Sequence, residues 1–331
     1  MLQRKVQLTG SSTLAVSLPK AWTKRYDVRP QTPLFIWEGP DGNLTVSRNH
    51  DVQPTEEARF DVSQFGNRPE NLRRAFIAKY LAGSTSFRFT SAKPISKVFR
   101  KTILEESHLL IGLEVVDESE HEIHVQDFFS PRSLSLEKAM KRTHDILCHM
   151  QESISLFLET GDENLLIQTR NKDDEVDRLM FLVLRLLNAS LNSSLMLAEL
   201  KLSTNECIYY SFVIRVLESM ADSLDSIAEH LQRAPNGKKF IPTRQTIRAL
   251  NDEVLVLQRS AMKSFFERDV KKANETLDAY EKLLPKFASM SDRLHEKELS
   301  FEYRQTKNSM MWVARKAMDI ADTAVDVSYL H

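Results

Sequence analysis

Acidic side chains at a four-residue spacing form the clearest candidate site in the sequence. In the segment LESMADSLDSIAEHL, Glu218 and Asp222 are four residues apart. Residues at this spacing lie on one face of a helix with Cβ atoms about 5–6 Å apart, so two ionised carboxylates repel each other. If a second helix that carries Asp174 and Asp177 faces them, the four side chains form a cage of hard oxygen ligands. Such a cage suits Mg²⁺, Ca²⁺, Mn²⁺ or iron, and a bound cation would relieve the repulsion.

The same acidic row has a simpler interpretation, in which it lines the solvent-exposed flank beside an apolar stripe. A related row recurs in ARKAMDIADTAVDVS at an offset of 97 residues (315 minus 218), where Arg315 stands in place of Glu218. The fixed cation of Arg315 would take the place of a metal there, so we expect one intact site. The weaker candidates for metal ligation are Asp225, Asp278, Asp319 and Asp322.

Catalytic chemistry has no comparable signal in the sequence. We find no P-loop, dinucleotide-binding glycine motif, nucleophile elbow or zinc-type spacing of Cys and His. A carboxylate-bridged metal oxidase would need Glu-x-x-His on two helices, and the helical part of the chain offers only Asp292-x-x-His295. We therefore expect a protein that is not an enzyme.

The residues that break helices divide the chain near Pro131. Residues 1–131 hold eight of the eleven prolines and six of the eight glycines. After them come long stretches with apolar residues at spacings of three and four, which predict amphipathic helices. We predict an all-α C-terminal bundle of six helices over residues 131–331, arranged as two three-helix repeats at about 131–234 and 240–331. The predicted helices span residues 133–160, 164–201, 205–233, 242–267, 270–297 and 300–329.

We predict a multidomain protein, in which the first part of the chain contains β-strands and divides into two domains. The short alternating segments KVQL, LAVSL, LFIW and LTVS predict strands, and the turn sequence GPDGN predicts a hairpin between the last two. KAWTKRY, after Pro19, predicts a short helix. We assign residues 1–51 to a small β-rich head. Residues 52–130 form an α+β middle domain, with helices at 69–82 and 94–106, a strand at 86–90 and a strand pair at IGLEVV and EIHVQDF.

The helical part resembles a known family at particular residues. DDEVDRLMFLVLR, residues 173–185, resembles the second helix of PhoU domains, and Glu218-x-x-x-Asp222 is similar to the acidic motif of that family. The resemblance spans about 133–331 and is strongest to archaeal phosphate-uptake regulators. It implies a bundle of two three-helix repeats, and some members of the family bind metal clusters through these acids. The resemblance therefore implies a divalent metal (Mg, Mn, Fe or Zn) at Asp174, Asp177, Glu218 and Asp222.

The head carries a net positive charge in a chain that is nearly neutral. Its first 50 residues contain seven Lys and Arg against three Asp and Glu, a balance of +4, whereas the whole chain has a net charge of -1. KVQLTGSSTLAVSLPKAW resembles the start of SpoVT/AbrB-like swapped-hairpin domains, which are dimeric and bind DNA. The resemblance places DNA contacts at Arg4, Lys5, Thr9, Ser11, Ser12, Lys20, Lys24 and Arg25. The alternative explanation is that these side chains form a solvent-exposed face of the head and contact no ligand.

Together these features predict a homodimeric, phosphate-responsive regulator of phosphate uptake. The head would bind DNA, and the bundle would sense a metal or a partner. The alternative is an adaptor without DNA binding, which docks on a phosphate transporter ATPase or a sensor kinase. The N-terminal sequence lacks the apolar stretch of a signal peptide and the apolar runs are too short to cross a bilayer, so we expect no transmembrane segment and a cytoplasmic location.

Overall fold

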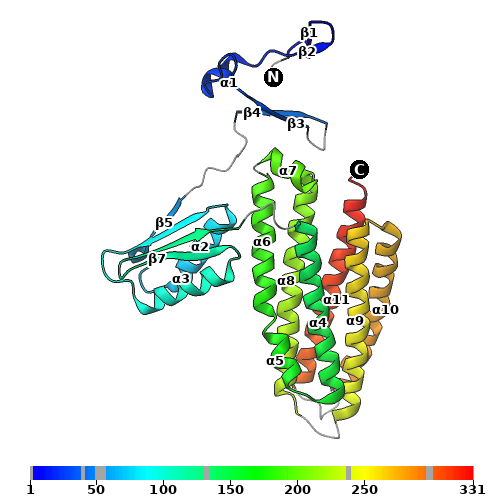
Figure 1. The fold of residues 1–331 in the computed structure, drawn as a ribbon. Helices are drawn as coiled ribbons and strands as arrows, with labels where there is room; N and C mark the ends of the chain where they lie inside the picture. The colour runs from blue at the N-terminus through cyan, green and yellow to red at the C-terminus, as the bar shows by residue number, and fades with distance from the viewer. Residues whose placement is uncertain are drawn as a thin grey trace.

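The structure is a computed structural model that describes residues 3–38, 42–48, 57–129, 135–191, 193–235, 240–295 and 301–330. A small β-rich region lies at the N-terminus, an α/β unit follows it, and a helical bundle forms the rest (Figure 1). This order agrees with the division that the proline and glycine distribution predicts. None of the described helices contains a stretch that is both long and apolar enough to cross a membrane.

The N-terminal head consists of two separate hairpins joined by a short helix. Strands β1 (Gln7–Thr9) and β2 (Thr13–Ala15) form the first antiparallel pair, and helix α1 (Lys20–Arg25) follows them. Strands β3 (Phe35–Glu38) and β4 (Leu44–Ser47) form the second pair. Residues 39–41 of the predicted turn lie outside the described part, but the strands on both sides pair as a hairpin. The predicted order of strand, strand, helix, strand, strand is therefore confirmed.

The head has no apolar core of its own. Among its described side chains none is buried. Apolar residues on both hairpins remain in contact with solvent, and the exposed fractions are 66% for Leu8, 70% for Leu14, 64% for Ile36 and 69% for Leu44. A unit of this size without a disulfide or metal needs further burial of apolar surface to be stable. The described part of the head therefore leaves apolar side chains on both hairpins without a packing partner.

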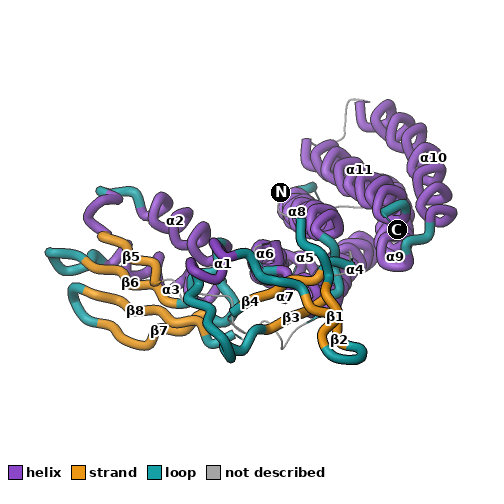
Figure 2. The backbone as a smooth tube through the Cα atoms, turned by 90° about the horizontal axis from the view of Figure 1, so that it is seen from above, coloured by secondary structure: helices purple, strands orange, loops and turns teal. Residues whose placement is uncertain are grey.

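The middle domain is a four-stranded sheet with two helices. Its strands lie in the order β5-β6-β8-β7, as Figure 2 shows from above, and β5 pairs with β6 in parallel. The remaining neighbours are antiparallel. In its core, the ring of Phe76 packs edge-on against the rings of Phe87 and Phe89. The elements are β5 (Glu57–Asp61), the 3-10 helix η1 (Val62–Phe65), α2 (Pro69–Leu81), β6 (Ser86–Thr90), α3 (Lys97–Leu109), β7 (Leu113–Glu118) and β8 (Glu122–Asp127).

For the middle domain, the sequence analysis placed the start of one helix too early and missed one strand. The second helix begins at Lys97 rather than at 94, because the hydroxyl of Ser96 accepts a hydrogen bond from the backbone N–H of Phe99 and caps the helix there. Strand β5 was not predicted, although Ala58 and Phe60 alternate with polar residues as in a half-buried strand. The alternation covers five residues, which is too short to distinguish it from a loop.

The bundle contains more helices than the sequence predicts. The segment 164–201, expected as one helix, forms the three helices α5 (Asn164–Arg170), α6 (Asp173–Leu191) and α7 (Ser194–Leu200). The first break follows Arg170, where the N–H of Lys172 bonds to the carbonyl of Thr169 in a tight turn, and Ser193 caps α7. The other helices are α4 (Leu136–Thr160), α8 (Thr204–Arg233), α9 (Ile241–Glu267), α10 (Val270–His295) and α11 (Phe301–Ser328). Their bounds agree with the predicted helices to within three residues at the described ends.

A reciprocal amide pair joins the first helices of the two halves of the bundle. Gln151 on α4 donates from Nε2 to the carbonyl of Asn251 at 3.2 Å, and Asn251 on α9 donates from Nδ2 to the carbonyl of Gln151 at 2.9 Å. Asn251 also donates to the hydroxyl of Ser155 at 2.8 Å. Both side chains are buried, and these bonds satisfy their amide nitrogens, whereas Oε1 of Gln151 and Oδ1 of Asn251 have no hydrogen-bond partner among the described residues.

Candidate functional site

Helix α6 places acidic side chains at the edge of the bundle. Its first turn contains Asp173, Asp174 and Glu175, and Asp177 follows one turn later. Acidic residues favour a helix N-terminus, because the unpaired N–H groups there carry partial positive charge. The buried residues Val176, Met180 and Val183 lie on the adjacent face of the helix and anchor it in the core. The sequence thus fixes both where α6 begins and which side of it meets α8.

The acidic residues of α6 and α8 lie close enough to repel one another. Burial, together with the charges of Asp222 and Asp174, raises the pKa of Asp177 to about 6. Burial, together with the charges of Asp222 and Asp177, raises the pKa of Glu218 to about 7. The carboxylates of Asp177, Glu218 and Asp222 therefore lie close enough to interact electrostatically.

Asp173 also belongs to this cluster, although the sequence analysis did not select it. Burial raises its pKa to about 7, and Asp222 is the largest of the neighbouring charges that add to this effect. A signal was present, because Asp173 and Asp177 have the same four-residue spacing as Glu218 and Asp222. We call Asp173, Asp177, Glu218 and Asp222 the acidic cluster. Asp174 lies at its exposed edge.

The weaker candidates lie in other surroundings. Asp225 accepts a hydrogen bond from Arg170 at 3.0 Å, and Asp319 accepts one from Lys316 at 3.0 Å. Asp278 on α10 and Asp322 on α11 are exposed. Arg315, which stands in place of Glu218, lies over the ring of Trp312 at 6.0 Å. The second half of the bundle thus pairs Asp319 with a lysine where the first half collects carboxylates.

The donor chemistry of the acidic cluster suits a hard divalent cation, but its side chains are not arranged as a finished coordination shell. Within the described residues, no three Asp, Glu, His or Cys side chains converge closely enough to hold a metal ion. Two carboxylates come from each helix, and each is half-buried or at the edge of the cluster. A cation would therefore have to draw them together by side-chain rotation. The side chains of Asp292 and His295 lie outside the described part.

The middle domain docks on α6 through an arginine that the sequence analysis missed. Arg185 donates from Nη2 to Oδ2 of Asp127 at 2.6 Å and from Nη1 to the carbonyl of Tyr80 at 3.0 Å. Its guanidinium also lies over the Tyr80 ring, 4.3 Å from the centroid. One turn later, Asn188 donates to the carbonyl of Leu81 at 3.0 Å. Helix α6, which is the labelled bundle helix beside the middle domain in Figure 1, therefore carries two of the four acidic residues of the cluster and the attachment of the middle domain.

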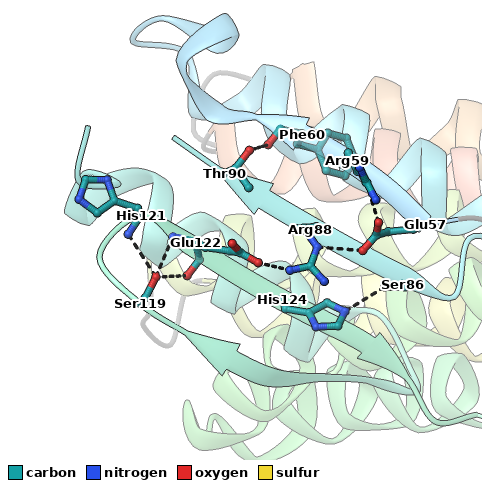
Figure 3. A network of polar contacts seen from close by, with 10 residues as sticks. All are labelled: Glu57, Arg59, Phe60, Ser86, Arg88, Thr90, Ser119, His121, Glu122 and His124. Atoms are coloured by element: carbon teal, nitrogen blue, oxygen red, sulfur yellow. Dashed lines mark hydrogen bonds and ion pairs between the residues drawn. The ribbon is translucent and has the colours of Figure 1, made fainter. Parts of the chain in front are cut away.

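The open face of the middle-domain sheet is polar and internally paired. Figure 3 shows Arg88 between Glu57 and Glu122, one carboxylate from each neighbouring strand. The hydrogen bonds from Arg88 and Arg59 lower the pKa of Glu57. Ser86 and His124 form a further cross-strand pair at 2.9 Å. These side chains satisfy one another, so we assign this face no chemistry.

The candidate DNA contacts all lie on the surface of the head. Some are on or beside the β1–β2 hairpin and the others are on α1. The exposed candidates are Arg4, Lys5, Thr9, Ser11, Ser12, Lys20, Lys24 and Arg25. Their exposure leaves them available to a ligand, and their role in DNA binding stays a prediction.

The titration of the acidic cluster leads to a testable pH dependence. In the folded chain, the pKa values of Asp173, Asp177 and Glu218 lie above their ordinary values, which are 3.8 for Asp and 4.5 for Glu. Their contribution to stability is therefore complete below about pH 4 and is lost as the pH rises to about 7. In EDTA, we expect the free energy of unfolding to fall over this range. The fall should be smaller in Asp177→Asn/Glu218→Gln, measured by urea denaturation at each pH. Equal slopes for both proteins would contradict this assignment.

Comparison with known proteins identifies the first half of the bundle. Residues 140–231 match the family model described as PhoU domain. The chain is also similar to two crystal structures. One is the phosphate transport system regulatory protein PhoU from Streptococcus pneumoniae, with a TM-score of 0.49, 15% identity and coverage of 59% of this chain and 94% of that chain. The other is PhoU from Pseudomonas aeruginosa, with a TM-score of 0.42, 14% identity and coverage of 58% and 91%. No curated protein sequence matches the chain. The similarity to a PhoU domain thus covers residues 140–231, from α4 to α8.

Proposed function

We propose that the chain is a cytoplasmic regulator of phosphate uptake, not an enzyme, that binds DNA as a homodimer through its head. The PhoU domain at residues 140–231 supports the role in phosphate transport. The basic charge of the head and its resemblance to swapped-hairpin domains support the role in DNA binding.

The observation that carries the dimer is the absence of buried side chains among the described residues of the head. Leu8 and Leu14 are cross-strand partners on one face of the first hairpin, and both are exposed. Ile36 and Leu44 are similarly exposed on the second hairpin. Pairing with a second copy would bury these apolar side chains and double the positive charge presented to DNA. A two-fold symmetric head suits a two-fold symmetric DNA site.

Phosphate contacts by the head make its DNA affinity depend on salt. We expect the triple variant Arg4→Gln/Lys5→Gln/Lys24→Gln to bind DNA more weakly and with a flatter salt dependence. If each basic side chain neutralises one phosphate, the slope of log K against log salt becomes less negative by about 0.9 for each, which is about 2.7 for each head and about 5.4 for the dimer. Fluorescence anisotropy at several salt concentrations measures this slope. An unchanged slope would show that these three residues belong to a solvated face.

The acidic cluster is the proposed sensing site of the bundle. A divalent cation between α6 and α8 would offset the repulsion of the four carboxylates and draw the two helices together. A shift between two bundle arrangements would then change the spacing of the two heads. We expect Asp177→Asn/Glu218→Gln to bind Mn²⁺ at least about tenfold more weakly, because each lost ligand removes a charge. Asp145→Asn, an exposed acid on α4, is the matched control, and calorimetric titration with MnCl₂ is the measurement.

The regulatory role is tested by recovering the DNA bound to the full chain in cells. The fragments should be enriched near phosphate-transport genes, and the enrichment should change between phosphate-replete and phosphate-starved growth. The triple head variant serves as the control for nonspecific recovery. Equal recovery of all sequences by the unaltered chain would overturn the DNA-binding function.

An adaptor function is the second candidate. It is favoured by apolar side chains exposed on the bundle, since Ile208 and Phe212 lie one turn apart on α8 with exposed fractions of 60% and 44%. Such a pair suits docking on another protein. Metal-dependent binding to a phosphate transporter ATPase without recovery of specific DNA would favour this function.

A further inference from the structure

The first helices of the two bundle halves share a polar contact around a buried cysteine. Cys148 on α4 is buried, and its Sγ lies 3.5 Å from Nε2 of His144, one turn earlier on the same helix. From α9, Nε2 of Gln258 lies 3.8 Å from the same sulfur. Thiolate and imidazole are the side-chain ligands that zinc prefers in proteins. The interface of α4 and α9 therefore contains a pair of zinc-type ligands, on different helices from the acidic cluster.

The separation of these two ligand atoms matches a tetrahedral metal site. Zinc binds sulfur at about 2.3 Å and imidazole nitrogen at about 2.0–2.1 Å, so tetrahedral bonds hold the two atoms about 3.5–3.6 Å apart. The distance of 3.5 Å between Sγ of Cys148 and Nε2 of His144 lies in this range. Without a metal, the same contact is a hydrogen bond between a thiol and an imidazole. The groups around the pair decide between these two interpretations.

The amide of Gln258 is not explained by a simple pair of thiol and imidazole. This side chain is fully buried, and its Nε2 donates to Sγ of Cys148. Its Oε1 has no hydrogen-bond partner among the described residues, which is uncommon for a buried polar atom. Exchanging the two amide atoms by rotation would leave Nε2 without a partner instead. A metal beside the sulfur, or a water bound to that metal, would provide the missing partner.

A cation and a third possible ligand already lie beside the sulfur. Arg259 of α9 donates to Sγ of Cys148 and forms an ion pair with Glu152. His144, Cys148 and Glu152 follow one another at a spacing of four, so they lie on one face of α4. Among the described residues, no third ligand completes the pair while Arg259 holds Glu152. The side chains of Arg259 and Glu152 are 49% and 44% exposed, so both have room to turn.

We propose that His144, Cys148 and Glu152 bind a divalent cation of the zinc class, such as Zn²⁺ or Co²⁺. The thiol proton passes to solvent as the bond between sulfur and metal forms. The metal replaces the Arg259 guanidinium as the positive charge between Cys148 and Glu152. Gln258 donates to the bound thiolate, so the site links the first helices of the two bundle halves. It is independent of the acidic cluster, whose oxygen ligands suit harder cations.

Cobalt binding to the full-length chain tests the proposal. CoCl₂, added with a reductant that does not bind metals, should produce the absorption band of charge transfer from thiolate to Co²⁺ and saturate it at about one ion per chain. Cys148→Ser should abolish this band, whereas Cys207→Ser changes the only other cysteine and should retain it. Added Zn²⁺ should remove the band by taking the same ligands. No thiolate band in the unaltered chain, or an equal band in Cys148→Ser, would overturn the site.

Further variants test the groups around the cysteine. His144→Asn should weaken Co²⁺ binding at least about tenfold, whereas His149→Asn changes an exposed histidine of the same helix and should have no effect. Arg259→Met should raise the affinity severalfold, because it removes the cation that competes for the thiolate and the carboxylate. Circular dichroism should show the same helix content in each variant. Unchanged affinity in both His144→Asn and Arg259→Met would show that cobalt binds the cysteine without the proposed site.

The acidic-cluster variant distinguishes this site from the proposed sensing site. Carboxylates produce no thiolate band, so Asp177→Asn/Glu218→Gln should leave the cobalt band unchanged. If Mn²⁺ fails to bind the chain but the cobalt band forms, the cysteine site stands and the sensing function is wrong. If Co²⁺ binds without a thiolate band and this variant abolishes the binding, the metal lies at the acidic cluster and the cysteine site is wrong.

Discussion

Replacement of Arg185 by methionine should release the middle domain from the bundle and lower the stability of the docked state by about 3–5 kcal/mol, since removing one partner of a buried ion pair strands the other charge. The Asp127 carboxylate is 5% exposed and receives its charged hydrogen bond from Arg185. The substitution also removes the bond to the carbonyl of Tyr80 and the contact with its ring. Urea denaturation followed by circular dichroism should show a separate, earlier transition for the middle domain.

The control for this prediction is Arg178→Met, which changes an exposed arginine on the same helix. It should leave the unfolding transition in place. The double variant Arg185→Met/Asp127→Asn should recover part of the loss, because a neutral amide is less costly to bury than a carboxylate. A single unchanged transition in Arg185→Met would show that the apolar contacts of Leu81 and Phe181 suffice to hold the domain.

Replacement of Leu14 by aspartate in the head should abolish head association and weaken DNA binding by about 100-fold, because linked binding units gain 10²–10⁴ in avidity. Leu14 is 70% exposed in β2 and faces its cross-strand partner Leu8. A charge on this face cannot be buried between two copies without a partner. Sedimentation equilibrium of the full chain measures association, and anisotropy measures DNA affinity.

Thr13→Asp is the matched control for association, because it introduces the same charge one residue earlier, on the other face of the strand. It should leave the oligomeric state unchanged. A dimer that survives Leu14→Asp would place the association elsewhere in the chain, and unchanged DNA affinity in that variant would rule out a requirement for paired heads.

The sequence was most informative where one signal repeated over many residues. The apolar periodicity of α4, α8, α9 and α11 predicts helices whose described ends differ from the structure by at most three residues. It failed at residues 164–201, since the apolar pattern continues through two breaks that depend on a tight turn after Arg170 and on the cap at Ser193. Each of these breaks involves only a few residues, so it does not interrupt the apolar periodicity from which the helices are predicted.

At the candidate site, the sequence likewise indicated relations within one helix but not contacts between domains. The spacing of Glu218 and Asp222 indicated one helix face, and the resemblance to PhoU domains supplied the second helix with Asp177. Asp173 was missed although it has the same spacing. Arg185 had no signal at all, because its partner Asp127 lies in a different domain and neither spacing nor composition relates the two residues. Interactions between domains are set by packing, which a single sequence does not display.

The reciprocal bonds of Gln151 and Asn251 have a consequence for assembly. Apolar contacts between α4 and α9 are not directional, so by themselves they tolerate a displacement of one helix along the other. Any such displacement breaks both reciprocal bonds, and each buried amide that loses its partner costs about 1–3 kcal/mol. The pair thus acts as an alignment key, which favours a single register between the first helices of the two halves of the bundle.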